Sequence, residues 1–338
     1  MNIQHNVSLK EFTTFGIAAR AKLFCEINSI NELKSILSEP SLLQEEKLIL
    51  GGGSNLLFTK DYEGVVIKMN LRGIEVVEED GVHIWLKVGA GEIWHEFVLY
   101  CIDNNWQGVE NLSLIPGTVG AAPMQNIGAY GVEIKDVFGS LEAVNIATGE
   151  METFSHEQCQ FGYRESVFKH EAKGQYMICS VTFRLNKNPS YNTSYGAIKN
   201  TLEANGIQEI SAKVISDAVI QIRQGKLPDP SKIGNAGSFF KNPTVDSIDY
   251  EGLKAEFPRI PAYELPEKRF KIPAAWLIEQ CGWKGKRLGE IGVHTNQPLV
   301  LVNYGEGKGT DIKNLALKIQ KSVTDKFGIA LSMEVNIV

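Results

Sequence analysis

The sequence predicts an α+β protein. Short apolar runs at residues 47–50, 64–69 and 82–88 have the length and composition of β-strands. Between them lie segments in which apolar residues recur at the spacing of an amphipathic helix. With 338 residues, of which 43% are hydrophobic, the chain is long enough for two or three domains, each with its own core.

The first half of the chain has the clearest element signals. Ser29 and Glu32 have the spacing of a capping box, and apolar residues follow them at helical spacing, which predicts a helix beginning there. A second amphipathic helix is predicted at about 92–103, and further strands at 140–147 and 176–185. These strand–helix–strand units form the first α+β part of the chain.

A polar, turn-rich stretch at 186–196 predicts a domain boundary at or shortly after it. Beyond it we expect helices near 201–205, 211–224, 274–281 and 311–327, and strands near 299–302 and 331–338. The last helix carries its apolar residues on one face and is followed by Gly328, a residue type that commonly ends helices.

Composition argues against several classes of protein. A formal net charge of −6 is not typical of a nucleic-acid-binding surface. The N-terminal residues lack a basic start followed by an apolar core, and no run of about eighteen apolar residues occurs, so we expect no secretory signal and no membrane span. The 5 cysteines are scattered and the 6 histidines lack ligand spacing, so we expect a reduced, cytoplasmic protein without a metal.

The segment 115–131 is the most informative stretch of the chain. It is rich in glycine and alanine, contains Pro116 and Pro123, and is almost free of bulky or charged side chains. Glycine allows close approach of the backbone, while proline stiffens its path. Such a segment suits main-chain N–H and C=O groups that surround a flat ligand with polar edges.

A second glycine segment, 51–53, follows the strand at 47–50. Consecutive glycines at a strand end can present successive N–H groups to phosphate oxygens. The segment is neither a G-x-G-x-x-G fingerprint nor a Walker A loop. A flexible turn is the alternative, and the presence of the segment 115–131 favours a ligand-binding loop.

Individual side chains could carry chemistry. Arg164 lies among aromatic and glycine residues, Ser238 follows small residues and precedes two phenylalanines, and Glu334 is an acid within the predicted terminal strand. Each also has an ordinary structural interpretation, as a surface ion pair, a turn residue and an outward strand position. Arg223 and Lys226 are phosphate-binding candidates, or favourable charges at a helix C-terminus.

Considered together, these segments resemble one enzyme family. The matching stretches are 51–57, 115–123, 125–131, 161–164, 226–228 and 234–243. They are similar, in order, to the UDP-N-acetylenolpyruvoylglucosamine reductases of bacterial cell-wall precursor synthesis. The resemblance implies an FAD-binding domain of the vanillyl-alcohol-oxidase (PCMH) type at 1–195, in subdomains of about 1–62 and 63–195. It also implies a separate α+β substrate-binding domain at 196–338, whose terminal strand contributes to the active site.

The resemblance also implies roles for particular residues. Ser238 would be the proton donor, with Arg164 and Glu334 completing the catalytic site. The non-covalent FAD would contact Gly51, Gly52, Gly53, Ser54, Asn55, Leu56, Ile115, Pro116, Gly117, Thr118, Gly120, Ala121, Ala122, Gln125, Asn126, Gly128, Ala129, Tyr130 and Gly131. The nucleotide-sugar substrate would be held by Tyr195, Arg223, Lys226, Asn242 and Gln297. Tyr195 suggests the subtype in which a loop closes over the substrate.

The implied reaction has two steps. NADPH reduces FAD and leaves, and flavin N5 then delivers hydride to C3 of the enolpyruvyl group of UDP-N-acetylglucosamine enolpyruvate. Ser238 protonates C2, which gives UDP-N-acetylmuramate. A fixed cation such as Arg164, or a protonated acid such as Glu334, would stabilise the developing charge in a dry site. We expect a monomer that acts on a small molecule and has no nucleic-acid or membrane partner.

Two other functions stay open on the sequence. An oxidase on the same FAD scaffold is disfavoured because neither glycine segment contains a histidine, the residue to which covalent flavin is often attached in such enzymes. A nucleotide-sugar binding protein without catalysis is disfavoured because Arg164, Ser238 and Glu334 are all present.

Overall fold

The computed structural model describes residues 2–338, which form two compact units. The first comprises residues up to Val7, Ala21–Gly53 and Glu63–Gly225, and the second comprises Ser8–Arg20, Ser54–Tyr62 and Lys226–Val338. The boundary expected between residues 195 and 196 lies inside the first unit. The assignment of residues 196–338 as a substrate-binding domain therefore stays a prediction.

The first unit begins with a four-stranded sheet covered by α1 (Ile30–Leu37). Its order is β1 (Gln4–Ser8), β2 (Arg20–Ile27), β5 (Tyr62–Met69) and β3 (Lys47–Leu50), with β3 parallel to β5. The predicted cap of α1 is confirmed, because the Ser29 hydroxyl accepts the Glu32 N–H at 3.2 Å. The Glu32 carboxylate accepts the N–H of Asn28 at 2.8 Å. Both the predicted helix and the predicted strands of this sheet are present.

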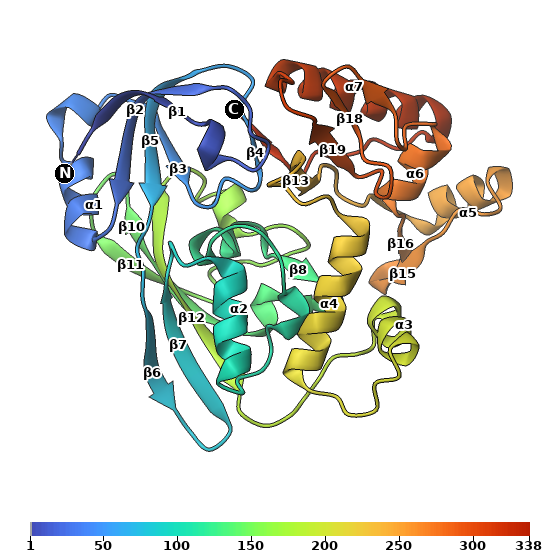
Figure 1. Ribbon diagram of the computed structural model, residues 1–338, viewed down its shortest axis with the longest axis horizontal. Coiled ribbons are helices and arrows are strands. Elements are labelled where there is room, and N and C mark those ends of the chain that lie inside the picture. The colour runs from blue at the N-terminus through green and yellow to red at the C-terminus, as the bar shows by residue number, and fades with distance from the viewer. Residues whose placement is uncertain (1) are drawn as a thin grey trace. The chain divides into compact units, whose positions relative to one another are not determined.

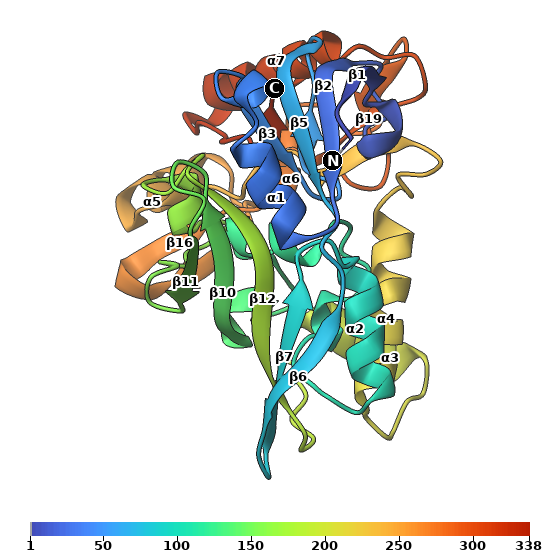
Figure 2. The ribbon, with the colours of Figure 1, turned by 90° about the vertical axis from the view of Figure 1, so that its left-hand side faces the viewer.

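A five-stranded antiparallel sheet forms the larger layer of the first unit, and Figure 2 shows its long, twisted strands. Its order is β11 (Met151–Ser155), β10 (Phe138–Asn145), β12 (Tyr176–Asn186), β7 (His83–Gly89) and β6 (Ile74–Glu79). The helix α2 (Trp94–Asp103) buries its apolar face in the same hydrophobic core as β7 and β12. This is the predicted second helix.

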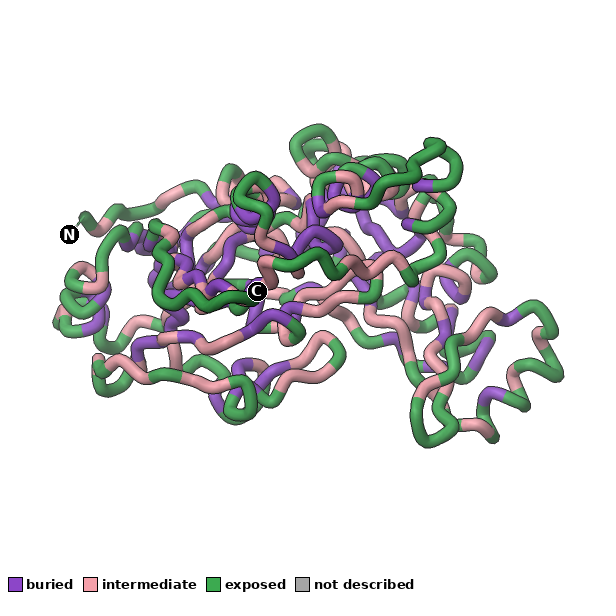
Figure 3. The backbone as a smooth tube through the Cα atoms, turned by 90° about the horizontal axis from the view of Figure 1, so that it is seen from below, coloured by how far each residue is buried: buried purple, intermediate pink, exposed green. Residues whose placement is uncertain are grey.

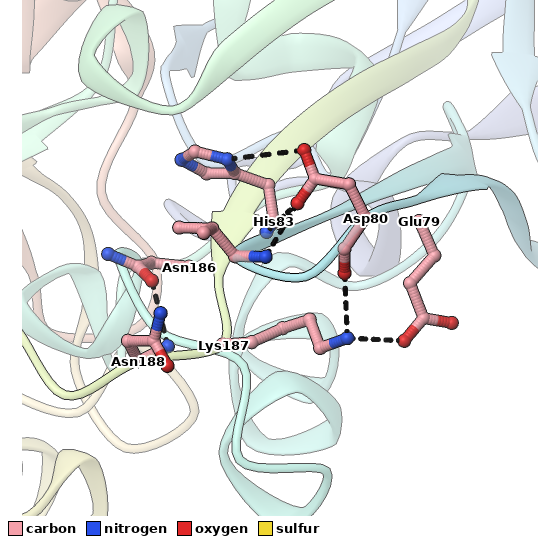
Figure 4. Close-up of polar contacts among 7 residues, drawn as sticks. Glu79, Asp80, His83, Asn186, Lys187 and Asn188 are labelled. Carbon is pink, nitrogen blue, oxygen red and sulfur yellow. Dashed lines mark hydrogen bonds and ion pairs between the residues drawn. The ribbon is translucent and has the colours of Figure 1, made fainter.

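Polar contacts close the outer end of this sheet (Figure 4). The Asp80 carboxylate accepts the N–H groups of Val82 and His83, both at 2.6 Å, in the turn between β6 and β7. Lys187, directly after β12, donates to Glu79 at 2.6 Å and to the Asp80 carbonyl at 2.9 Å. These bonds join the end of β12 to the turn between β6 and β7. None of the predicted site residues lies in these two segments.

Two helices complete the first unit. They are α3 (Gly196–Ala204) and α4 (Ala212–Lys226), which share a small core that includes Ile198, Leu202 and Val219. The first of them begins earlier than the expected residue 201. Between the second helix α2 and strand β10, the chain forms short 3-10 turns and the small hairpin β8 (Gly128–Ala129) and β9 (Val132–Glu133).

The second unit has a four-stranded antiparallel sheet under the long helix α7 (Gly309–Phe327) (Figure 1). The order is β13 (Gly234–Ser238), β19 (Val300–Asn303), β18 (Ile291–Val293) and β17 (Arg287–Leu288). The helix α7 packs on β18 and β19 and against α6 (Ala274–Gln280). Gly328 ends α7 with a φ of 68°, as the sequence predicted.

Smaller strands complete the second unit. A three-stranded sheet, with α5 (Ser247–Glu256) beside it, has the order β14 (Thr244–Val245), β16 (Arg269–Lys271) and β15 (Tyr263–Leu265). The predicted terminal strand at 331–338 is wrong in extent. Met333 pairs with Phe240, and only β20 (Asn336–Ile337) then pairs, in parallel, with β4 (Leu56–Leu57). The chain changes pairing partner between these points, which prevents a continuous strand.

The first described residues, 2–8, are largely exposed (Figure 3). This stretch contains β1, which is an edge strand. None of the helices in residues 2–338 combines the length and the apolar character needed to cross a membrane.

Candidate active site

The two glycine segments pack directly against each other in the first unit. A Cβ atom on Gly52 would lie 2.5 Å from the Cα of Gly117, and one on Gly51 would lie 2.7 Å from the Thr118 hydroxyl oxygen. Real Cβ atoms do not approach other atoms this closely, so both positions require glycine. Gly120 is equally confined, since its Cβ would lie 2.5 Å from that of Ala90.

This contact leaves polar groups of the protein without internal partners. Within residues 2–338, the N–H groups of Gly52 and Gly53 donate to no other residue. The hydroxyl of Thr118 is also buried without a hydrogen bond among these residues. Leaving the buried Thr118 hydroxyl unsatisfied costs about 1–3 kcal/mol, so this hydroxyl and the two N–H groups fit a polar ligand that supplies the missing partners.

Asn126 organises the far end of the segment 115–131. It is buried, with a left-handed φ of 44°. Its side-chain amide donates to Glu133 and to the Gly162 carbonyl, each at 3.0 Å, and accepts the Lys135 N–H at 3.1 Å. The side chain of Asn126 is thus occupied by the protein, so its predicted contact with FAD stays a prediction that the backbone would have to fulfil.

Arg164 lies beside the same segment. Its backbone has a φ of 57° in a turn that Gly162 and Glu165 close by hydrogen bonds to each other. The guanidinium group donates to the Gly128 carbonyl at 2.6 Å. The structure therefore brings one predicted catalytic residue to one predicted cofactor-binding residue.

A second guanidinium group belongs to Arg223, on α4. Burial lowers the pKa of this group, the phenol of Tyr130 opposes that change through a hydrogen bond, and the charge of Arg164 lowers the pKa further. Burial likewise raises the pKa of the Tyr130 phenol. The Arg223 Nε atom is buried without a partner among the described residues. Two neighbouring cations, one with an unused donor, favour an anionic ligand.

Tyr195 stands next to this cluster. Its ring is perpendicular to that of Tyr130, with centroids 5.3 Å apart and an interplanar angle of 89°, and it is 44% exposed. Lys226, the last residue of α4, is exposed. Their contacts with a substrate stay predictions.

Sequence reasoning missed two asparagines that join these segments. The buried Asn111 donates to the carbonyls of Tyr130, at 3.0 Å, and Asn192, at 2.9 Å. The Asn192 side chain donates to the Gly131 carbonyl at 3.1 Å and accepts from Ser194. The polar stretch 186–196 was interpreted as a domain boundary and, at Tyr195, as part of a loop that closes over the substrate, but not as a hydrogen-bonding segment. Its asparagine content was the available signal of local hydrogen bonding.

In the second unit, Ser238 is the last residue of β13 and pairs with Val300. The next residue, Phe239, donates to Leu299 at 2.7 Å and accepts the N–H of Glu334 at 2.8 Å. The structure therefore places the backbone of Glu334 beside that of the serine strand. The Ser238 hydroxyl is partly exposed and makes no hydrogen bond within residues 2–338.

Three other predicted residues of this unit have internal partners. The Asn242 side chain accepts the N–H of Ala274, the first residue of α6, at 2.9 Å. The Gln297 side chain accepts the Leu299 N–H at 3.4 Å. Asn55 donates through its side chain to the Glu334 carbonyl at 3.2 Å. Asn242 and Asn55 thus have a positioning role, and their contacts with ligands stay predictions.

The described residues contain no group of three histidine, cysteine, aspartate or glutamate side chains that could hold a metal ion.

Comparisons with known proteins identify the family. Residues 21–155 match the family described as "FAD binding domain". Residues 229–338 match the family described as "UDP-N-acetylenolpyruvoylglucosamine reductase, C-terminal domain". The UDP-N-acetylenolpyruvoylglucosamine reductase of Flavobacterium johnsoniae is 53% identical over 339 residues, covering 100% of both chains. The chain belongs to the UDP-N-acetylenolpyruvoylglucosamine reductase family. Another member, from Amoebophilus asiaticus, is 54% identical over 338 residues and also covers 100% of both chains.

Solved structures agree on the fold. The crystal structure of the UDP-N-acetylenolpyruvylglucosamine reductase from Thermus caldophilus matches with a TM-score of 0.68 and 24% identity, covering 100% of this chain and 99% of the other. A 6-hydroxy-D-nicotine oxidase from Arthrobacter nicotinovorans matches with a TM-score of 0.50 and 12% identity, covering 99% and 88%. The predicted α+β fold with an FAD-binding domain is confirmed.

This member of the UDP-N-acetylenolpyruvoylglucosamine reductase family is an FAD-dependent oxidoreductase. The structure of the first unit fits the cofactor. Several of its glycines admit no Cβ, and within the described part of the chain two of its N–H groups and the buried Thr118 hydroxyl have no hydrogen-bond partner. These features suit a ligand with phosphate oxygens and polar ring edges.

Proposed function

We propose that this enzyme uses NADPH to reduce UDP-N-acetylglucosamine enolpyruvate to UDP-N-acetylmuramate, a step of peptidoglycan precursor synthesis. The name shared by relatives that match its full length supports this substrate. We also propose that the enzyme is a cytoplasmic monomer.

Gly51–Gly53 and the segment 115–131 would hold non-covalent FAD through main-chain groups. Bound FAD would supply the hydride that adds to C3 of the enolpyruvyl group. Ser238 would contribute the proton for C2, and Arg164 would contribute positive charge for the substrate.

Ser238 is the proposed proton donor. Addition of hydride to C3 leaves negative charge at C2 and on the attached carboxylate, so a proton must reach C2. A serine hydroxyl is a weak acid and can donate only if it is held close to that carbon. Its position at the end of a paired strand would provide that constraint. General acid catalysis of this kind typically contributes about 10²–10⁴-fold to the rate.

Arg164 and Glu334 are proposed to stabilise the charge on the carboxylate. A guanidinium group can form two parallel hydrogen bonds to a carboxylate. The Arg164 side chain is already oriented by its bond to the Gly128 carbonyl at 2.6 Å. Arg223, Tyr195, Lys226, Asn242 and Gln297 would bind the remainder of the nucleotide sugar.

The observation that most supports these roles is the hydrogen bond from the Glu334 N–H to the Phe239 carbonyl, at 2.8 Å. It joins the backbone of Glu334 to the residue that follows Ser238, although Ser238 and Glu334 are far apart in sequence, and this supports a shared role for their side chains. Neither residue is required there by the hydrophobic core, because both are partly exposed.

A two-stage anaerobic experiment tests the function. The purified protein should be yellow and should lose its flavin absorbance when NADPH is added without oxygen. Addition of the enolpyruvyl substrate should then restore the absorbance, whereas UDP-N-acetylglucosamine should not. A protein that is reoxidised only by oxygen would be an oxidase, and one that is never reduced would be a binding protein. Either result would overturn the proposal.

A further inference from the structure

A lysine with no assigned role contacts the first glycine segment. Lys68 lies in β5, in register with Leu50 at the end of the parallel strand β3. Its ammonium group donates to the carbonyl of Gly51. The lysine therefore reaches past the end of β3 to the point where the chain enters the glycine loop.

This contact determines the direction of an N–H group. The peptide bond is planar and trans, so the Gly51 carbonyl and the Gly52 N–H point in opposite directions. With the carbonyl directed to Lys68, the Gly52 N–H points away from β5. It is one of the two loop N–H groups that donate to no other described residue.

The loop is also confined from the other side. A Cβ on Gly52 would lie 2.5 Å from the Cα of Gly117, so the loop cannot move toward the segment 115–131. Lys68 and Gly117 thus constrain Gly51 and Gly52 from two directions. The peptide group between these two glycines is therefore oriented before a ligand arrives.

The charge of Lys68 is partly shielded from water. Burial lowers the pKa of the ammonium group, the carboxylate of Glu26 opposes this effect, and the guanidinium group of Arg72 adds to it. A half-buried cation acts through a lower effective dielectric than an exposed one, so its field acts more strongly on a nearby anion.

We propose that Lys68 is a positioning residue for the diphosphate of FAD. It holds the Gly51 carbonyl so that the N–H groups of the glycine loop face the phosphate oxygens, and it adds one positive charge behind the loop. The proposal rests on FAD binding alone and does not depend on the roles of Ser238, Arg164 or Glu334.

Equilibrium binding of FAD to the flavin-free, full-length protein tests this role. Lys68→Met keeps the length of the side chain but removes the charge and the donor, so FAD affinity should fall about 10- to 100-fold. Lys68→Arg retains the charge and should keep most of the affinity. The matched control is Lys47→Met, because Lys47 donates to the Leu42 carbonyl at 2.8 Å from the opposite end of β3. That variant should bind FAD like the wild type.

The salt dependence of FAD binding separates the contribution of the Lys68 charge to FAD affinity from that of the shape of its side chain. Wild-type affinity should decrease more steeply with salt than that of Lys68→Met, because only the wild type loses the screened attraction of this cation. Equal affinity of Lys68→Met and the wild type would overturn the proposal. So would a Lys68→Arg variant as weak as Lys68→Met, or identical salt dependence in Lys68→Met and the wild type. A thermal melt of each flavin-free variant establishes that it is folded.

Discussion

Two predicted catalytic residues, Ser238 and Arg164, are held in place in different ways. Ser238 in the second unit ends a paired strand, and its position is set by backbone hydrogen bonds of its neighbours. Arg164 in the first unit lies in a turn with a φ of 57°, and its own side chain bonds to the Gly128 carbonyl. Among residues 2–338, the hydroxyl of Ser238 bonds to no other residue, whereas the guanidinium group of Arg164 does.

This difference determines which property of the enzyme a substitution in each unit tests. A change at Ser238 should alter chemistry alone, because no described residue depends on its hydroxyl for a hydrogen bond. A change in the first unit should alter structure and binding together, because the side chains of Arg164 and Asn192 bond to the segment 115–131 and that of Asn126 bonds from this segment to Gly162.

The largest effect is expected for Ser238→Ala. The oxidative half-reaction, in which substrate reoxidises the flavin, should slow by about 10²–10⁴-fold, because the general acid is lost. Reduction by NADPH should be nearly unchanged, as should the melting temperature. Stopped-flow absorbance measures both half-reactions. Ser332→Ala, on the adjacent chain segment and exposed, is the control. If both half-reactions slow together, the assignment of Ser238 is wrong.

Gly52→Ala should act on the first unit. The new Cβ would meet Gly117 Cα at 2.5 Å, and inserting one carbon into a packed site costs about 1–3 kcal/mol. The cofactor loop must shift, so FAD affinity should fall about 10- to 100-fold. The absorbance ratio of flavin to protein after purification measures the loss.

Gly81→Ala is the control for this change, because a Cβ there meets nothing within 4 Å. It should retain FAD like the wild type. If Gly52→Ala also retained FAD at the level of this control, the contact between the two glycine segments would not be needed for binding.

The regular elements were largely predictable from the sequence, because their signals are local. The cap at Ser29, the apolar face of α2 and the stop at Gly328 were predicted and are present. The terminal strand was predicted too long, because its pairing changes from Phe240 to β4 within a few residues. That change depends on distant parts of the chain, which a local pattern does not report.

The candidate site also has parts that the sequence indicated and parts that it did not. Composition alone indicated the two glycine segments, because small residues are needed for close backbone contact. The roles of Lys68, Asn111 and Asn192 could not be predicted. Each bonds to a carbonyl that is not adjacent in sequence, and lysine or asparagine at such positions is ordinary in a strand or a loop.

Asn192→Ala should have an intermediate effect. It removes the bond to Gly131 and both bonds to Ser194, so the Tyr195 loop loses its direct side-chain hydrogen bond to the segment 115–131. Of these bonds only the one to Gly131 joins the loop to the segment 115–131, and its loss, at about 1 kcal/mol, should raise the KM for the substrate roughly fivefold, with little change in kcat. Hydrogen exchange of residues 190–196 in the substrate-free protein should become faster.

Asn192→Asp tests the two parts of this attachment, since it keeps the acceptor for Ser194 but loses the donor to Gly131. Asn205→Ala, which removes an exposed bond to Gln221 at 2.9 Å, is the control. Faster exchange with an unchanged KM would mean that the loop is loosened but that Tyr195 does not bind substrate. Unchanged hydrogen exchange of residues 190–196 would show that the Asn192 side chain does not hold this loop to the segment 115–131.

The smallest effect is expected at His95, which supports the start of the segment 115–131. Its Nδ1 atom accepts the N–H of Leu114, at 3.0 Å, where the chain has a φ of 59°. Burial lowers the pKa of His95, the charge of Arg223 lowers it further, and Glu96 opposes the change. The folded protein thus favours the neutral ring, whose Nδ1 can accept a hydrogen bond. Protonation would abolish that acceptor.

The sign of the pH dependence follows from these pKa values. As the pH falls through the ordinary histidine pKa of about 6.5, the unfolded chain takes up a proton before the folded one does, so stability is lost on acidification. The melting temperature of the wild type should therefore fall more between about pH 7 and pH 5.5 than that of His95→Gln, whose amide oxygen can accept the same bond without titrating. Parallel curves for the two proteins would show that folding does not lower the pKa of His95. A steeper decline in the wild type would mean that one neutral imidazole supports the strained backbone at Leu114, directly before a glycine-rich segment proposed to hold FAD.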